Sequence, residues 1–232
     1  LQSDQLSAGV RLSFEQFNIE LNGYFVNKSG VLQDARLLDG IPQGTYLNDL
    51  LIGSGTSHGL EVLLKKDLGV HSGWLSYSLS QAENNFSQGP FVDLPTDFDQ
   101  RHEINLVYLF RYKRWSASLS WVYGSGRPFT SALGTYDFTT LNGNSNEWVA
   151  FGEVYGSRIP EYHRLDFSTS YSTTWLGLNM EFGTSLYNLY NRSNPRELQY
   201  FISGIEESGL SLDVKELSYL GFTPSLNLAI IW

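Results

Sequence analysis

The polar residues that could do chemistry lie in short clusters, and the most suggestive one contains the residue types of a hydrolase triad. His163 shortly precedes Asp166 and Ser168. In an extended strand, successive side chains point to opposite faces, so Asp166 and Ser168 share one face and His163 lies on the other. The three groups cannot converge without a bulge. We therefore assign no catalytic residue and do not expect an enzyme.

Two further clusters are candidates for binding. The segment PTDFDQRHE places Asp97, Asp99, Arg101, His102 and Glu103 at a loop-to-strand junction, but its oxygens lack the regular spacing of a calcium loop. We interpret it as a solvated network of acid and arginine pairs at a rim. The segment GSGRPFT lacks the Walker spacing and its lysine, so it predicts a strand exit and turn. No metal or cofactor is expected.

Composition narrows the class of protein. Aromatic residues make up 15% of the 232 residues, yet mean hydropathy is only -0.22. No apolar run reaches the roughly 18 residues of a membrane-spanning helix, which excludes a helical membrane protein. The net charge of -9 without a basic stripe makes nucleic acid an unsuitable partner. The absence of cysteine excludes disulfides and zinc-thiolate sites.

The elements that must position these clusters are amphipathic strands, because apolar and polar residues alternate. The pattern is clearest at the end of the chain, where apolar residues occupy the even positions from Leu220 to Ile230 and small or polar residues the odd ones. Similar stripes include Leu176, Leu178, Met180, Phe182 and Leu186, and also Trp115, Leu119 and Trp121. The region 103–111 is noisier, because Val107 and Leu109 fall on its polar side. We expect about nine strands of the length of a tilted membrane strand.

The connections alternate between short and long. Short turns are predicted near 14–16, 67–72, 112–114 and 174–175, and long loops at about 27–54, 84–100, 125–162 and 191–217. Bacterial outer-membrane barrels have short periplasmic turns and long extracellular loops. If the last strand descends to the periplasm, the first visible strand descends too, whereas a complete barrel begins by ascending. We therefore expect further strands, and a removed or distant leader, before Leu1.

An ordered series of segments resembles the TonB-dependent outer-membrane receptors. The segments are GTSHGLEVLLKKDLG, GWLSYSLSQAENNF, LPTDFDQRHEINLVYLF, WVYGSGRPFT, RIPEYHRLDFSTSY, SLYNLYNRSNP and FTPSLNLAIIW. The resemblance implies that residues 1–232 form the C-terminal part of an all-β transmembrane antiparallel barrel of ~22 strands. It also implies a plug domain, absent from this chain, and import powered by a TonB-type energy-coupling protein.

Several residues receive expected roles from this interpretation. Glu103, Arg164, Asp166 and Glu181 fall on polar faces and are candidates for contacting solute or plug, as are the aromatic loop residues Tyr136, Phe138 and Trp148. The C-terminal stripe resembles the signal that the barrel-assembly machinery recognises; its members are Phe222, Leu226, Leu228, Ile230 and Trp232. Aromatic rings near strand ends predict headgroup girdles: Tyr108, Tyr112, Trp115, Trp121, Tyr123, Tyr171 and Trp175.

We therefore predict a receptor or transporter component in the bacterial outer membrane, in contact with lipid and a small solute. The solute could be a ferric chelate, a corrin or an oligosaccharide. A smaller closed barrel acting as an enzyme or adhesin is one alternative, and it would need an even strand number. A soluble β-sandwich is another, and it would need its apolar faces packed against each other.

Overall fold

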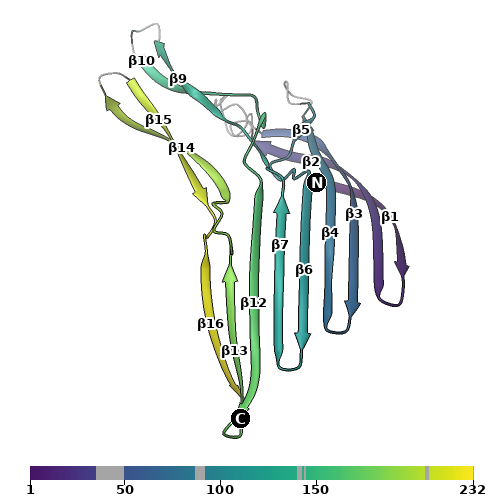
Figure 1. Cartoon of the computed structure of the whole chain (residues 1–232). Coiled ribbons are helices and arrows are strands. Elements are labelled where there is room, and N and C mark those ends of the chain that lie inside the picture. The colour runs from purple at the N-terminus through teal and green to yellow at the C-terminus, as the bar shows by residue number, and fades with distance from the viewer. Residues whose placement is uncertain (35–49, 87–91, 140–142, 144, 207–208, 232) are drawn as a thin grey trace.

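The computed structural model describes residues 1–34, 50–86, 92–139, 143, 145–206 and 209–231, and most of these residues are in β-strands. Among them no helix is long and apolar enough to cross a membrane. Figure 1 shows the long strands side by side in one curved sheet, with smaller hairpins extending beyond one end.

Nine long strands form the main sheet, as predicted, and each pairs antiparallel with its neighbours. Within the described residues no pairing joins the first strand to the last, so the sheet is open. In sheet order the strands are β1 (Gln2–Ser13), β2 (Phe17–Asp34), β3 (Leu50–Leu68), β4 (His71–Phe86), β6 (His102–Tyr112), β7 (Trp115–Gly124), β12 (Tyr162–Trp175), β13 (Leu178–Tyr187) and β16 (Thr223–Ile231).

The pairing register gives the sheet one apolar face and one polar face. Because side chains alternate along each strand, a correct register aligns residues of one kind across several strands. One apolar row is Ile19, Leu64, Leu75, Leu106, Trp121 and Leu165. One polar row is Asn22, Glu61, Ser78 and Glu103.

The region 103–111, where apolar and polar residues alternate poorly, forms a regular strand in the structure. Val107 lies on the polar face, where it pairs with Trp74 on β4. Trp74 pairs in turn with Lys65 on β3, so an apolar spot interrupts the polar face near the short turns. The alternation was weak there because both faces of β6 carry apolar residues, not because the strand is absent.

The predicted turn at 174–175 was wrong. Thr174 and Trp175 still pair with Asn179 and Leu178, and the turn consists of Leu176 and Gly177, with φ of 51° and 79°. Leu176, which we expected in the apolar stripe of the next strand, is therefore a turn residue. Two positive φ values in a two-residue hairpin are the geometry of a type I′ turn, which matches the twist of the strands.

The long loops are shorter than predicted, because they contain strands of their own. Strands β2, β3 and β4 extend into two of the predicted loops. The segment 125–162 contains a hairpin whose register places Trp148 opposite Tyr136. The additional strands are β5 (Leu94–Pro95), β8 (Pro128–Phe129), β9 (Ala132–Thr139), β10 (Ser145–Phe151), β11 (Ser157–Arg158), β14 (Pro195–Glu206) and β15 (Gly209–Ser218).

The buried apolar cluster is small and lies at the base of the loops. Phe86 at the end of β4 is 1% exposed and Leu51 at the start of β3 is 7% exposed. Val154 and Tyr155 pack against them from the segment between β10 and β11. Burial, and secondarily the Asp97 carboxylate, raise the pKa of Tyr155 above its ordinary value.

Candidate functional site

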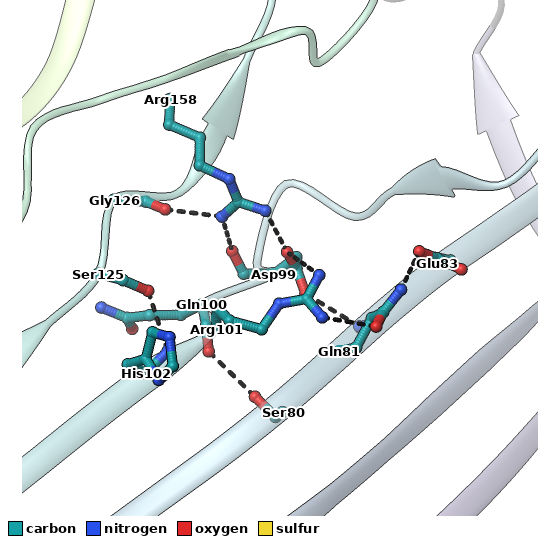
Figure 2. Close-up of polar contacts among 11 residues, drawn as sticks. Ser80, Gln81, Glu83, Asp99, Gln100, Arg101, His102, Ser125, Gly126 and Arg158 are labelled. Carbon is teal, nitrogen blue, oxygen red and sulfur yellow. Dashed lines mark hydrogen bonds and ion pairs between the residues drawn. The ribbon is translucent and has the colours of Figure 1, made fainter.

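A buried carboxylate connects two loops at the long-loop end of the sheet. Asp99, between β5 and β6, is 2% exposed. Its Oδ2 accepts a hydrogen bond of 2.6 Å from the guanidinium of Arg158, which also donates to the carbonyl of Gly126 at 2.8 Å. The other oxygen accepts from the amide of Ala82 at 3.0 Å. Figure 2 shows Arg158 reaching down onto Asp99 from the neighbouring loop.

Arg101 belongs to the same network but is held less closely. Its guanidinium lies 3.9 Å from Asp99 and donates to Gln81 Oε1 at 2.5 Å. The prediction of acid and arginine pairs in this segment is confirmed, with one correction: Asp99 is buried rather than solvated. Its principal partner, Arg158, is distant in sequence, and only the fold shows the contact.

A pocket of about 380 Å³ opens beside this network on the polar face. Strands β6, β7, β12 and β13 all contribute to it. We call it the mouth site, because it lies at the long-loop end, which faces the cell exterior in this type of barrel. Its polar lining includes Gln100, Glu103, Arg127, Tyr162, Arg164, Tyr187 and Tyr219.

Arg164 is the most highly coordinated side chain of the mouth site. Its guanidinium binds both oxygens of Asp166 at 2.9 Å and donates to the hydroxyls of Tyr162 and Tyr187, each at 2.6 Å. It also lies 4.1 Å from the ring centroid of Tyr187, within cation-π range. Asp166 compensates its charge, so Arg164 mainly fixes the tyrosines in place.

Arg127 is the less compensated cation of the mouth site. Its guanidinium donates to the backbone carbonyl of Arg196 at 3.4 Å. In the described part of the chain no carboxylate lies within ion-pair distance of it. The mouth site thus offers a cation and phenolic hydroxyls to an oxygen-rich anion.

The predicted polar-face residues fall into two places. Glu103, Arg164 and Asp166 gather at the mouth site, where Glu103 accepts a hydrogen bond from Asn105 at 3.1 Å. Glu181 lies apart from them, in a separate hollow of about 300 Å³ whose lining includes five serines. Tyr136 is 49% exposed on β9. The side chains of Phe138 and Trp148 lie outside the described residues.

The hydrolase triad does not form. His163 lies on the apolar face, where its Nδ1 is 2.7 Å from the Tyr190 hydroxyl. Asp166 binds Arg164 on the polar face, and Ser168 pairs with Ser118 through a hydroxyl contact of 2.7 Å. Among the described residues no group of acidic or histidine side chains could hold a metal ion.

Two buried asparagines organise the wall beneath the mouth site, and we did not predict them. Asn194 is 1% exposed; its side chain accepts from the amide of His163 and donates to the carbonyl of His163, each at 3.0 Å. Asn188 is fully buried and bonds the backbone of Arg192 and Leu220. The segment SLYNLYNRSNP contains both residues, so the signal was present, but only the contacts reveal their role.

The C-terminal stripe lies on the apolar face of β16. Leu226, Leu228 and Ile230 are exposed there by 83%, 55% and 42%, and Phe222 by 45% just before the strand. Trp232 lies outside the described residues. The role of this stripe as an assembly signal stays a prediction.

Comparisons with known proteins agree with this architecture. The family model "TonB dependent receptor-like, beta-barrel" matches residues 2–189. No curated protein matched the chain. Similar solved structures include the FrpB iron transporter from Neisseria meningitidis (F3-3 variant), with 12% identity and a TM-score of 0.57, and the unliganded ferric citrate transporter FecA, with 14% and 0.56. The outer-membrane ferripyoverdine receptor of Pseudomonas aeruginosa, bound to ferripyoverdine, has 10% and 0.54.

These structures are considerably longer than the chain. The three matches include 97%, 99% and 82% of this chain, respectively. They include only 30%, 31% and 23% of the solved chains. At such low identity the likeness shows the fold, whereas the family model covers most of the chain. The chain belongs to the TonB-dependent receptor-like β-barrel family and forms part of the wall of an outer-membrane barrel of Gram-negative bacteria.

Proposed function

We propose that this chain supplies part of the wall and the outer mouth of a receptor that takes up a scarce solute by energised transport. The observation that carries the proposal is the mouth site, where Arg127 and three tyrosines meet on the polar face of a barrel wall. In this proposal a plug and a TonB-type energy-coupling protein complete the transporter, and the chain itself performs no covalent chemistry.

We favour a ferric chelate among the possible solutes. Chelators of ferric iron present several oxygens and often a negative charge, which a guanidinium and phenolic hydroxyls bind well. The names of the three similar structures all refer to iron or its chelates, which supports the same class. A corrin and an oligosaccharide remain as competing outcomes of the test.

The test is binding by the intact receptor in detergent, with ferric citrate, a ferric catecholate, cyanocobalamin and a maltooligosaccharide as probes. Arg127→Gln should weaken binding of the preferred ferric chelate by about tenfold, as expected for losing one charge-assisted hydrogen bond. Arg114→Gln is the matched control, because Arg114 lies near a short turn at the opposite end and contacts Thr173 at 3.4 Å.

Two outcomes would contradict the proposal at different levels. Tight binding of cyanocobalamin or the oligosaccharide, with no binding of either ferric chelate, would overturn the solute class but leave the receptor assignment. Uptake in cells that persists without a TonB-type protein would overturn energised transport. If Arg127→Gln and Arg114→Gln change the affinity for the ferric chelate equally, the mouth site does not bind the solute.

A further inference from the structure

A groove lies on the apolar face near the short turns, far from the mouth site. It has a volume of about 740 Å³ and extends across β2, β3, β4 and β6. Its floor is at Gly73, which pairs with Lys66 on one side and Tyr108 on the other. Because glycine has no side chain, the sheet is recessed between the side chains of its two neighbours.

The upper part of the groove is lined by aliphatic side chains. Leu64, Leu75 and Leu106 form one cross-strand row next to Gly73 on the apolar face. Leu64 is 40% exposed and Leu106 is 38% exposed, so a large part of each residue is left open on this face. In a barrel of this family the apolar face contacts hydrocarbon, so the occupant of this row comes from the bilayer.

The lower end of the groove is polar and carries a cation. The Lys66 ammonium lies 5.3 Å from the ring centroid of Phe17, and among the described residues no carboxylate is within ion-pair distance. Two residues below Gly73 on the same face, His71 Nδ1 lies 2.6 Å from the Tyr108 hydroxyl. Asp67, which follows Lys66 in sequence, pairs with Ser72 and belongs to the polar face.

We propose that this groove binds an anionic glycerophospholipid from the inner, periplasmic leaflet of the outer membrane. One acyl chain lies along the row of Leu64, Leu75 and Leu106, and the phosphate contacts the ammonium of Lys66 and accepts a hydrogen bond from the His71–Tyr108 pair. Three features select this occupant together: apolar walls exposed to the bilayer, an uncompensated cation at one end, and a position near the short, periplasmic turns.

The test is native mass spectrometry of the intact receptor titrated with dioleoylphosphatidylglycerol in a neutral detergent. Lys66→Gln should weaken the tightest phosphatidylglycerol binding step by about fivefold, the usual contribution of one basic residue to binding an anionic lipid. Lys28→Gln is the matched control, because Lys28 has the same chemistry but lies on the polar face of β2, opposite Gly55 and outside the groove. It should leave the binding constant unchanged.

The lipid panel distinguishes the possible sources of the phosphate. Dioleoylphosphatidylcholine, with no net charge, should bind at least fivefold more weakly than phosphatidylglycerol. Lipid A carries phosphates but belongs to the outer leaflet, and its binding should not respond to Lys66→Gln. Equal effects of the two lysine substitutions, or a response to Lys66→Gln seen only with lipid A, would overturn the proposal.

Discussion

Asp99 has two arginine neighbours, and burial and distance decide which one matters. Arg158 makes a 2.6 Å contact, whereas Arg101 is 3.9 Å away. Arg158→Gln should lower the free energy of unfolding by about 1–2 kcal/mol. This is less than the ~3–5 kcal/mol for a fully buried pair, because the Arg158 side chain is 41% exposed.

Urea unfolding of the intact barrel in lipid vesicles, followed by gel mobility, measures this loss. Arg101→Gln is the control and should cost less than about 1 kcal/mol, since its contact with Asp99 is long and its side chain is 37% exposed. If both substitutions lower the free energy of unfolding equally, the close Arg158 contact does not connect the two loops.

Glu161 predicts a pH dependence at the same end of the sheet. A backbone hydrogen bond, and then the contact with Arg192 at 2.9 Å, lower the pKa of Glu161 below 4.5. Because the folded pKa is depressed, the stabilisation is fully present at neutral pH and disappears as pH falls through the folded value. Carbon-13 NMR of the Glu161 carboxyl should show a midpoint below 4.5.

The size of the arginine contribution can be tested with one substitution. Arg192→Gln should raise the Glu161 midpoint only in part, because the backbone hydrogen bond is the larger cause and remains. Glu153→Gln is the control, because it changes a different acidic residue in the loops. A midpoint that returns fully to the ordinary value would show that the backbone bond contributes nothing.

At the scale of elements, alternation alone predicts the nine strands, whereas turns and added hairpins depend on other properties. The stripe ending at Ile230 is almost perfectly alternating, and β16 follows it. The hairpin of β9 and β10 has aromatic residues among asparagine, glycine and threonine, so its pairing does not show in hydropathy. Asn188 and Asn194 satisfy backbone groups of distant segments, which no local pattern reveals.

The turn between β12 and β13 illustrates how local chemistry can oppose the fold. Leu176 adopts a φ of 51°, which a leucine tolerates poorly and an asparagine well. Leu176→Asn should therefore raise the free energy of unfolding by about 0.5–1 kcal/mol. Gly177→Val should lower it by at least ~1 kcal/mol, since φ there is 79°.

Urea unfolding in vesicles of the two variants measures both signs. Leu189→Asn, outside the turn, is the control for removing an exposed leucine, and it should not be stabilising. If Leu176→Asn instead lowers the free energy of unfolding, the leucine side chain stabilises the barrel through burial in the membrane interface. That stabilisation would then be larger than the destabilisation caused by the positive φ of Leu176.

At the scale of the whole molecule, aromatic rings mark two levels on the apolar face. Tyr112, Trp115 and Tyr171 pair in one row near the short turns, and the rings of Trp115 and Tyr171 are 4.7 Å apart. Trp121 and Tyr123 lie higher on the same face of β7. The strand from Trp115 to Tyr123 spans about 27 Å, comparable to the ~25 Å apolar band of such barrels once strand tilt shortens it.

This arrangement predicts which tryptophans contact lipid. Trp115 is on the apolar face, whereas Trp74 is on the polar face opposite Val107, although both are exposed in the open sheet, by 53% and 39%. In the intact receptor in vesicles, lipids brominated near the headgroup should quench tryptophan fluorescence. Trp115→Phe should remove part of that quenching, and Trp74→Phe should leave it unchanged. The reverse result would mean that the apolar stripes do not face the bilayer, and the assignment of the two faces would be wrong.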